Sequence, residues 1–410
     1  MLPQPVSALA PLEHAVFRSV WSAALVANLC MWMSDMAAAW MMTTLAAAPL
    51  WVALVQSAAT LPVFLLGLPS GALADMLDRR RFLVATQCWS AAVATSLCLV
   101  KVGGAMTPAL LLALTFANGI GLALRWPVLA ALVPTLVPRP QLPAALALNG
   151  VSMNASRLAG PLLAGALIST IGVEAVFVVN ALLSVGTALV LLRLRRFPAA
   201  APRAPERLGV AIGAGVQFVV RSARVKAVLL RVGVFFFHST CLIALLPLVV
   251  HERFDGAATT FSLLFGCMGA GAILAAGILP RLRLAFDRDA LVLRGVLLHA
   301  GMSALVALSH HLALTMAAMA LSGMAWMVTV NSLSVSVQLA LPDWVRARGM
   351  SIYQMALMGG SALGAAVWGQ VATVASFQVS LLLAAASAVA AMLITLRFVQ
   401  DRGEDDATVT

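Results

Sequence analysis

Charged residues are scarce in this sequence. Only 10% of its 410 residues are Asp, Glu, Lys or Arg, whereas 62% are hydrophobic. A soluble domain averages about 25% charged and about 45–50% apolar residues. The shortage of charge therefore excludes a soluble globular domain, a disordered chain and a nucleic-acid-binding domain. Together with a mean hydropathy of +1.00, it predicts an integral membrane protein.

Cysteine is also scarce, and no two cysteines form a CxxC pair. The five are Cys30, Cys88, Cys98, Cys241 and Cys267, all in apolar runs. This spacing indicates neither a disulfide framework nor a zinc site, so we expect no metal and no cofactor. Buried free cysteine behaves as a small hydrophobic residue, which is the role that we expect for these five.

Sequence motifs of ATP-driven and enzymatic chemistry are missing. The sequence has no GxxxxGK[ST] loop, which would cradle nucleotide phosphates, and no HExxH pair. We find no Ser/His/Asp set at one membrane face, so we expect no catalytic residues and no enzyme. A membrane enzyme or a non-transporting sensor is the remote alternative.

Long apolar runs dominate what is present. A membrane-spanning helix needs about 20 mostly apolar residues, whereas a membrane strand needs about ten in alternation. The predicted fold class is therefore an all-α integral membrane protein with about twelve transmembrane helices. The runs cover residues 18–44, 49–73, 82–101, 107–136, 143–171, 174–194, 226–250, 259–280, 290–309, 312–340, 349–373 and 377–398. Residues 1–16 lack the basic segment of a secretory signal peptide, so we expect the first run to remain in the mature protein.

Arginine and lysine cluster in alternate connections between these runs. One set of connections holds Arg79, Arg80, Arg81, Arg139, Arg193, Arg195, Arg196, Arg203, Arg207, Arg221, Arg224, Lys226, Arg281, Arg283, Arg288, Arg346, Arg348, Arg397 and Arg402. The opposite set holds only Lys101 and Arg253. By the positive-inside rule, we expect a multi-pass membrane protein with both termini in the cytoplasm. This placement accounts for most of the net charge of +11 without a nucleic-acid partner.

One long polar stretch divides the chain. We predict an N-terminal six-helix bundle over residues 1–196, a cytoplasmic linker with a short amphipathic helix over 197–225, a C-terminal six-helix bundle over 226–398 and a cytoplasmic tail over 399–410. An offset of 204 residues pairs Pro138 with Pro342, Gly160 with Gly364 and Gly165 with Gly369. Such ordered matches indicate two pseudo-symmetric bundles, as in duplicated transporters. We expect a monomer.

The connection after the second run carries a recognisable motif. The segment GALADMLDRRR, residues 71–81, resembles the major facilitator superfamily loop G-x-L-A-D-x-x-G-R-R-x, with Asp78 in place of a glycine. Residues 32–45, 61–75, 145–161 and 341–364 resemble the bacterial transmembrane secretion effector group, which includes enterobactin-exporter-like and macrolide-efflux proteins. The resemblance covers nearly the whole chain and implies the major facilitator fold and an exporter of the bacterial cytoplasmic (inner) membrane.

The same loop suggests a gate. The resemblance implies that Gly71, Asp75, Arg79, Arg80 and Arg81 form a clasp that closes the cytoplasmic side in one state. Arginines supply charge-assisted donors at the membrane surface, and a carboxylate accepts bonds at a helix N-terminus. The alternative is a loop that only determines topology.

Asp35 is the only carboxylate deep within a predicted span. Ionisable residues at membrane depth are costly, so each is a functional hypothesis. Burial disfavours the charged form of a carboxylate, which makes Asp35 a candidate for proton coupling or cation recognition. The alternative is an Asp near the outer interface or one satisfied by a neighbouring helix. Trp32, Met36 and Trp40 follow helical spacing and either line an adaptable apolar cavity or pack against lipid and helices.

Two arginines also lie within predicted spans. Arg125 is in the fourth and Arg157 in the fifth, where Asn154 shares its helix face. A buried arginine needs an acceptor, and Asp35 is the obvious intramembrane candidate for either one. The superfamily resemblance implies an arginine in the fourth span, which Arg125 matches, although a snorkelling Arg125 is the alternative.

Other candidates lie in both halves. Gly160, Pro161 and Gly165 resemble the antiporter motif G-P-x-x-G, which implies export; small residues there also allow ordinary close helix packing. His238 neighbours the position that the 204-residue offset assigns to Asp35, so it is a candidate titratable cavity residue, with a structural histidine as the favoured alternative. Gln354 marks a possible cavity face in the eleventh span.

These observations predict a secondary transporter that exports a small siderophore-, drug- or metabolite-like molecule by alternating access. Protons are the expected coupling ion, and the lipid bilayer and the small-molecule substrate are the other expected partners. Protonation of Asp35, or of a group coupled to it, would alter its pairing with an arginine. An importer or facilitator of the same fold is the alternative.

Overall fold

The computed structural model describes residues 9–46, 48–194, 216–254, 256–342 and 345–407, together with Ser7. The side chains of residues 68, 71, 72, 74–76, 347 and 396–407 lie outside this description. The described residues form twelve long α-helices and two short 3-10 helices, Ala10–Glu13 and Arg139–Gln141, with no strand among them. The long helices are α1 (Ala15–Leu45), α2 (Pro49–Met76), α3 (Arg79–Val102), α4 (Pro108–Leu136), α5 (Leu142–Thr170), α6 (Val173–Arg193), α8 (Ala223–Arg253), α9 (Ala258–Ala285), α10 (Arg288–Leu308), α11 (Leu312–Ala340), α12 (Arg346–Val374) and α13 (Phe377–Ala407).

Each apolar run of the sequence coincides with one of these helices, which confirms the all-α membrane fold. Eleven of the described helices are long and apolar enough to cross a membrane. The twelfth, α5, carries Asn149, Asn154 and Arg157 near its middle. Its polar residues therefore mark it as a helix that faces protein or a cavity.

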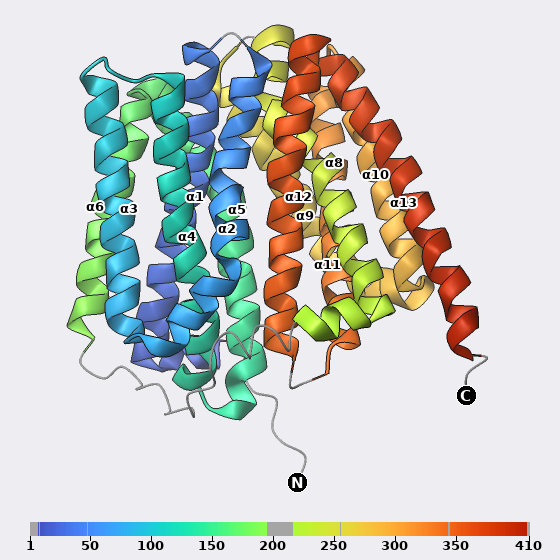
Figure 1. Cartoon of the computed structure of the whole chain (residues 1–410). Coiled ribbons are helices and arrows are strands. Elements are labelled where there is room, and N and C mark those ends of the chain that lie inside the picture. Colours follow the sequence, from blue (N-terminus) through green and yellow to red (C-terminus); the bar gives the residue numbers. More distant parts are fainter. Residues whose placement is uncertain are drawn as a thin grey trace.

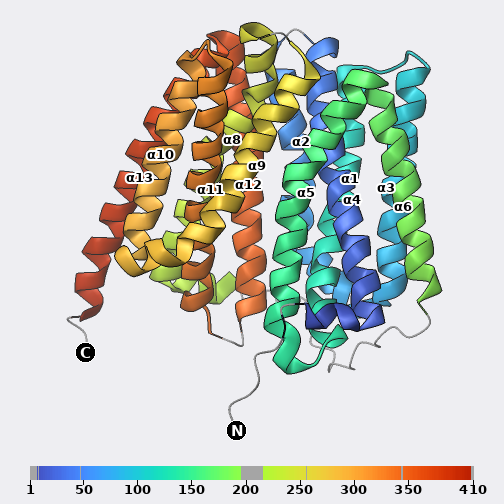
Figure 2. The same ribbon diagram turned by 180° about the vertical axis from the view of Figure 1, so that it is seen from behind.

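The helices form two bundles, α1–α6 and α8–α13, that stand side by side (Figures 1 and 2). The contacts repeat between them: α1 packs on α5 and α6, as α8 packs on α12 and α13, and α3 packs on α6, as α10 packs on α13. Across the divide, α2 packs on α12 and α9 packs on α5, which are equivalent pairs. The chain is therefore a pseudo-twofold pair of six-helix bundles. Of the predicted linker helix, residues 216–221 are helical, and residues 195–215 lie outside the description.

The glycines that the 204-residue offset pairs occupy equivalent contacts. Gly160 packs against α1 and Gly364 packs against α8, which is the repeat of α1. Gly165 packs against α9, and Gly369 packs against α2, the repeat of α9. Since a β-carbon would collide with the partner helix at each position, the repeat in the sequence records helix contacts that need glycine.

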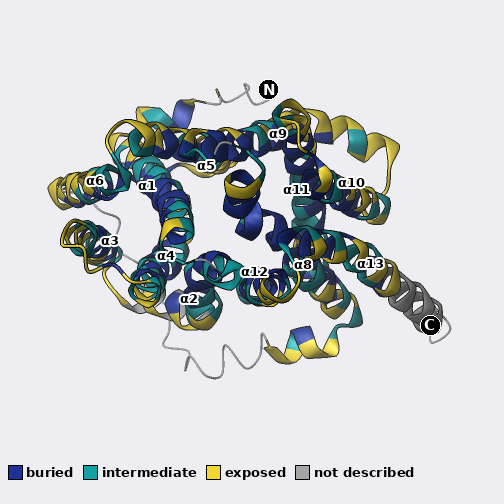
Figure 3. Cartoon of the chain, turned by 90° about the horizontal axis from the view of Figure 1, so that it is seen from above, coloured by how far each residue is buried: buried dark blue, intermediate teal, exposed yellow. Residues whose placement is uncertain are grey.

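The outward faces of the helices are apolar and exposed. In α6, for example, Leu182, Val185 and Leu189 are 68%, 48% and 50% exposed. Viewed from above, buried residues lie on the inner faces and exposed residues on the rim (Figure 3). Exposed aliphatic surface of this extent is unfavourable in water, whereas the hydrocarbon of a bilayer would solvate it.

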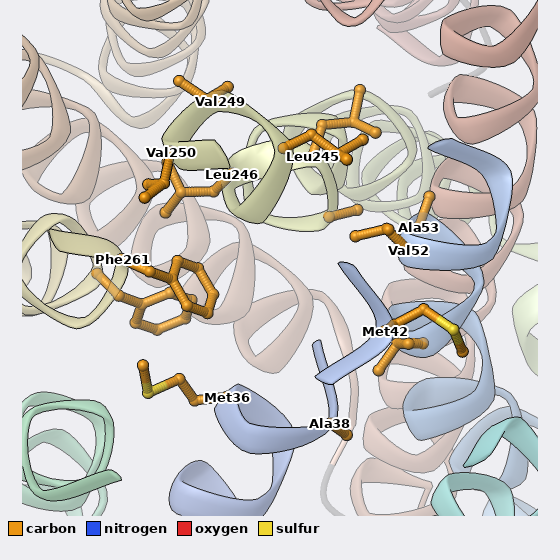
Figure 4. Packing of buried hydrophobic residues seen from close by; sticks show 14 of the residues in the cluster. Met36, Ala38, Met42, Val52, Ala53, Leu245, Leu246, Val249, Val250 and Phe261 are labelled. Atoms are coloured by element: carbon orange, nitrogen blue, oxygen red, sulfur yellow. The ribbon is translucent and has the colours of Figure 1, made fainter. Parts of the chain in front are cut away.

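The largest apolar cluster joins the two bundles at one end only. We call this end, where α1 and α8 finish, the distal side, and the end where they begin the proximal side. The distal cluster combines side chains of α1, α2, α8 and α9, including Met42, Val52, Leu245 and Phe261 (Figure 4). At the proximal side, separate clusters belong to the first bundle, around Phe17, and to the second. The bundles thus share a core at the distal side, where the molecule is closed.

The closest helix approach within the second bundle yields a stability prediction. A β-carbon at Gly271 of α9 would collide with the backbone of Ala320 in α11, whereas a β-carbon at Gly277, six residues along α9, meets nothing within 4 Å. Gly271→Ala therefore lowers the free energy of unfolding by about 1–3 kcal/mol, the usual cost of overpacking. Gly277→Ala keeps or raises it, because alanine is the better helix former. Thermal unfolding of both variants in detergent measures the difference, and equal stability would contradict the packing described here.

Candidate functional site

A cavity of about 450 Å³ lies between the two bundles. Its described lining residues come from α1, α2, α4 and α5 of the first bundle and from α8, α9, α11 and α12 of the second. These are four pairs of repeat-related helices, and α3, α6, α10 and α13 supply none of the described lining. The volume lies within the range of about 300–1,000 Å³ that is usual for small-molecule sites.

Many lining residues occupy positions that the 204-residue offset relates, but the charged residues have uncharged counterparts. The repeat-related pairs that both line the cavity include Trp32 and Phe236, Asp35 and Ser239, Leu122 and Trp326, Trp126 and Val330, and Arg157 and Ser361. Asp35 and Arg157 are the only two charged side chains among the described lining residues. Both belong to the first bundle, and a serine takes the equivalent position in the second.

Asp35 lies past the middle of α1 and is half-buried in the cavity wall. None of the described residues gives it a hydrogen bond or an ion pair; the ion pair between described residues is that of Arg231 with Asp289. Its carboxylate is therefore available to a proton or to a cationic group in the cavity.

Arg157 lies on α5 and is only 6% exposed. Its guanidinium carbon is 3.9 Å from the ring centroid of Trp326, across the divide in α11, and 5.7 Å from that of Trp32. Its Nε has no acceptor. The predicted pairing of Asp35 with Arg157 is therefore wrong for this structure, because the guanidinium rests on aromatic faces, which attract cations.

Arg125 occupies a different environment inside the first bundle. It is 6% exposed, so it does not snorkel, and its Nη2 donates to Oδ1 of Asn28 at 3.0 Å. It lines a small space of about 20 Å³ that also involves Gln87 and Asn180. The predicted pairing of Arg125 with Asp35 is also wrong, since the neutral Asn28 accepts its hydrogen bond.

The other candidate cavity residues divide into two groups. Trp32, Met36, Asn154, Pro161 and Gln354 line the cavity. Trp40 is not among the described lining residues. Its ring stacks on that of Phe261 in α9, with centroids 5.9 Å apart and an interplanar angle of 20°, which places it in the contact between the bundles.

His238 lines a separate small space between α8, α10 and α13. Its Nδ1 donates to the carbonyl oxygen of Val234 at 2.7 Å. His299 lines the same space, and its Nδ1 is 2.8 Å from Oγ of Ser322. His238 is therefore a hydrogen-bonded histidine within the second bundle and not part of the described cavity wall.

Arg79 and Arg80, in the first turn of α3, bond within the first bundle. Nη1 of Arg79 donates to the carbonyl of Ala131 at 3.2 Å, and Nε of Arg80 donates to that of Leu191 at 3.0 Å. Arg81 is exposed. These bonds tie α3 to α4 and α6; the side chains of Gly71 and Asp75 lie outside the described residues.

The structure explains why Asp78 replaces the glycine of the family loop motif. Its Oδ1 accepts the backbone N–H of Arg81 at 2.9 Å, so it caps the N-terminus of α3. Aspartate is among the preferred residues at this position.

Sequence reasoning missed much of the aromatic wall. Trp126, Phe236, Trp326 and Tyr353 all line the cavity. The 204-residue offset contained the signal, because it relates Phe236 to Trp32 and Trp326 to Leu122. Tyr353, the only tyrosine, carried no sequence signal for this position.

Comparison with known proteins identifies the kind of molecule. The chain matches the family model described as transmembrane secretion effector over residues 6–409. No curated protein matches the sequence. Similar solved structures include the nucleoside transporter NupG, with 15% identity, a TM-score of 0.76 and coverage of 93% of this chain and 98% of that one. A POT family transporter in complex with a thioalcohol-conjugated peptide has 13% identity, a TM-score of 0.75 and coverage of 93% and 96%. A bacterial homolog of the human lysosomal transporter Spinster, inward-facing and occupied, has 15% identity, a TM-score of 0.73 and coverage of 95% and 96%. At such identities the likeness shows the fold.

The bond between Arg125 and Asn28 yields the next prediction. Asn28→Leu removes the acceptor of a buried guanidinium and lowers the free energy of unfolding by about 1–3 kcal/mol. Replacing both partners by apolar groups is far less costly, so Asn28→Leu with Arg125→Met regains most of the loss. Thermal unfolding of the single and double variants in detergent measures the coupling. A double variant less stable than Asn28→Leu alone would contradict the assignment.

Proposed function

This chain belongs to the transmembrane secretion effector family and has the fold of major facilitator transporters, which are not enzymes, and we propose that it exports a small organic molecule in exchange for protons. Neighbouring structures of the same fold are described as transporters of nucleosides and as complexes with a peptide conjugate. The proposed cargo is a siderophore-, drug- or metabolite-like compound that fits the cavity between the bundles. The proposed location is the cytoplasmic membrane of a bacterium, and the proposed working unit is a monomer.

The observation that carries the proposal is Asp35. It is a carboxylate without a partner among the described residues, in a cavity shared by both bundles. An ionised group in such a place is costly, so binding of a proton or a cation there changes the free energy of the cavity. A proton-coupled transporter needs a group of this kind, and a merely structural carboxylate would have a partner.

The distribution of arginines supports an orientation of the protein in the membrane. Arg79, Arg80, Arg139, Arg193 and Arg288 all lie at the proximal ends of helices. We propose that the proximal side faces the cytoplasm, in accordance with the positive-inside rule. The distal core then closes the cavity towards the outside, so that this conformation is the one that receives cargo from the cell.

The proton gradient supplies the driving force in this proposal. Moving one charge inward through the membrane potential is worth about 2.3 kcal/mol per 100 mV. A proton that reaches Asp35 from outside neutralises the carboxylate, weakens its hold on a cationic cargo and favours return to the proximal-open state. Arg79, Arg80 and Arg81 are proposed to close the proximal side in the opposite state; in the present state Arg79 and Arg80 bond within the first bundle. The Gly160–Pro161–Gly165 segment, which packs against α1 and α9, is proposed as the contact about which the bundles move.

Asp35→Asn tests the coupling. Asparagine keeps the shape but carries no exchangeable charge, so pH-driven transport is lost while the variant remains folded. Glu252→Gln is the matched control, because it removes an exposed carboxylate at the distal end of α8. The measurement is movement of fluorescent amphipathic compounds, with the accompanying proton flux, in proteoliposomes with an imposed pH gradient. Full pH-driven transport by Asp35→Asn would remove Asp35 from the coupling role, and transport down the cargo gradient without proton flux would indicate a facilitator.

A further inference from the structure

We infer that the cargo is zwitterionic, with an anionic group at Arg157, a cationic group at Asp35 and a flat apolar body against the second bundle. This inference rests on the proposed transport function and adds the chemical class of the substrate. It starts from two opposite charges that line one cavity and yet form no ion pair with each other or with any described residue.

The second bundle shows what a satisfied wall looks like. Ser361, the repeat counterpart of Arg157, has its Oγ 2.7 Å from Oγ1 of Thr240, the counterpart of Met36. This pair bonds to itself and needs no ligand. In the first bundle the equivalent region keeps Arg157, whose Nε has no acceptor among the described residues, and Asp35, which has no donor among them. Both charged groups of the described lining therefore lack a polar partner and belong to one bundle.

The anion site consists of donors that lack acceptors. Arg157 Nε and Trp32 Nε1 are both buried and have no hydrogen-bond partner among the described residues. Both residues line the cavity, and the Arg157 guanidinium lies 5.7 Å from the Trp32 ring centroid. A guanidinium is the side chain best suited to a planar carboxylate, because it binds both oxygens through parallel hydrogen bonds.

The cation site lies one helical turn further along α1. Asp35 follows Trp32 by three residues, which corresponds to about 4.5 Å of rise on the same helix. Asp35 and Arg157 are farther apart than an ion pair, so a cargo must present its two charges at separate positions. A cargo ammonium group at Asp35 and a cargo carboxylate at Arg157 would together neutralise both charges of the first bundle's wall.

The opposite wall has no charge among its described residues. Phe236, Trp326 and Tyr353 of the second bundle line it, and aromatic faces of this kind bind flat apolar groups. A cargo with a single charge would leave either Asp35 or Arg157 desolvated and unpaired, and an unpaired buried charge is strongly unfavourable. The cavity therefore favours a molecule that carries both charges and an apolar body.

Matched ligands test this inference. Norfloxacin carries an amine and a carboxylate on a flat ring system; its ethyl ester keeps only the cation, and its N-acetyl derivative keeps only the anion. Tyrosine, its cation-only form tyrosine amide and its anion-only form N-acetyltyrosine, together with an analogous set of a longer aromatic amino acid, vary the spacing. Binding of each is measured at constant pH by quenching of tryptophan fluorescence in detergent. We expect at least one zwitterion to bind about tenfold or more tightly than both of its singly charged forms, a factor that corresponds to about 1.4 kcal/mol.

Two variants assign the charges to their sites. Asp35→Asn makes the preferred zwitterion and its anion-only form bind equally, and Arg157→Gln makes the zwitterion and its cation-only form bind equally. Glu252→Gln and Arg139→Gln, which each remove an exposed charge outside the described lining of the cavity, keep the wild-type preference. If no zwitterion binds more tightly than its singly charged forms, or if both variants keep the wild-type preference, the inference is wrong. Preference for the anion-only form would show that Asp35 binds a proton instead of cargo. Since the assay involves no gradient and no transport, a failure of proton coupling in vesicles leaves this result unaffected.

Discussion

The cost of holding a charge away from water determines where the polar atoms of this protein lie. Removing an ion from water without a partner costs several kcal/mol, and the surroundings repay it only through good geometry. Arg231 meets the cost through Asp289, with Nη1 and Oδ1 2.8 Å apart, and Arg125 meets part of it through Asn28. Arg157 has aromatic rings in place of an acceptor, and Asp35 has no partner among the described residues. Asp35 and Arg157 both line one cavity. A bound group that pairs with them there therefore stabilises the protein more than it would elsewhere.

Duplication explains how so large a cavity stays ordered. Contacts through Gly160 and Gly364 hold the long helices within each bundle, and contacts through Gly165 and Gly369 join the bundles. Small residues let backbones approach closely where hydrocarbon surrounds the protein and the hydrophobic effect between helices is weak. Eight helices, which form four repeat-related pairs, line the cavity. The two bundles kept these contacts but differ in charge, because both charged residues of the described lining belong to the first bundle.

The sequence predicted the fold closely and the site in part. Long apolar runs, the polar stretch near residue 200 and the 204-residue offset are local signals, and each corresponds to a helix, a connection or a glycine contact. The partners of Asp35, Arg125 and Arg157 depend on how helices rotate against one another, which runs of apolar residues do not specify. Complementary charge suggested that these arginines pair with Asp35. In the structure Arg157 instead contacts the ring of Trp326, and Arg125 donates a hydrogen bond to Asn28. His238 shows the same limit, because its neighbour Ser239 is the residue that shares the central cavity with Asp35.

Arg157 also connects the cavity to the arrangement of the bundles. It belongs to α5, but its guanidinium lies against Trp326 of the opposite bundle and near Trp32 of its own. A cation–π contact is worth about 0.5–2 kcal/mol, which is less than a desolvated bidentate pair with a carboxylate. An anionic group that binds Arg157 therefore competes successfully with Trp326 and weakens a contact across the divide near the middle of the membrane. The distal core remains, so the change in free energy falls on the contact between Arg157 and Trp326, which both line the cavity. Differential contact of this kind is what a ligand needs in order to shift a population between two states.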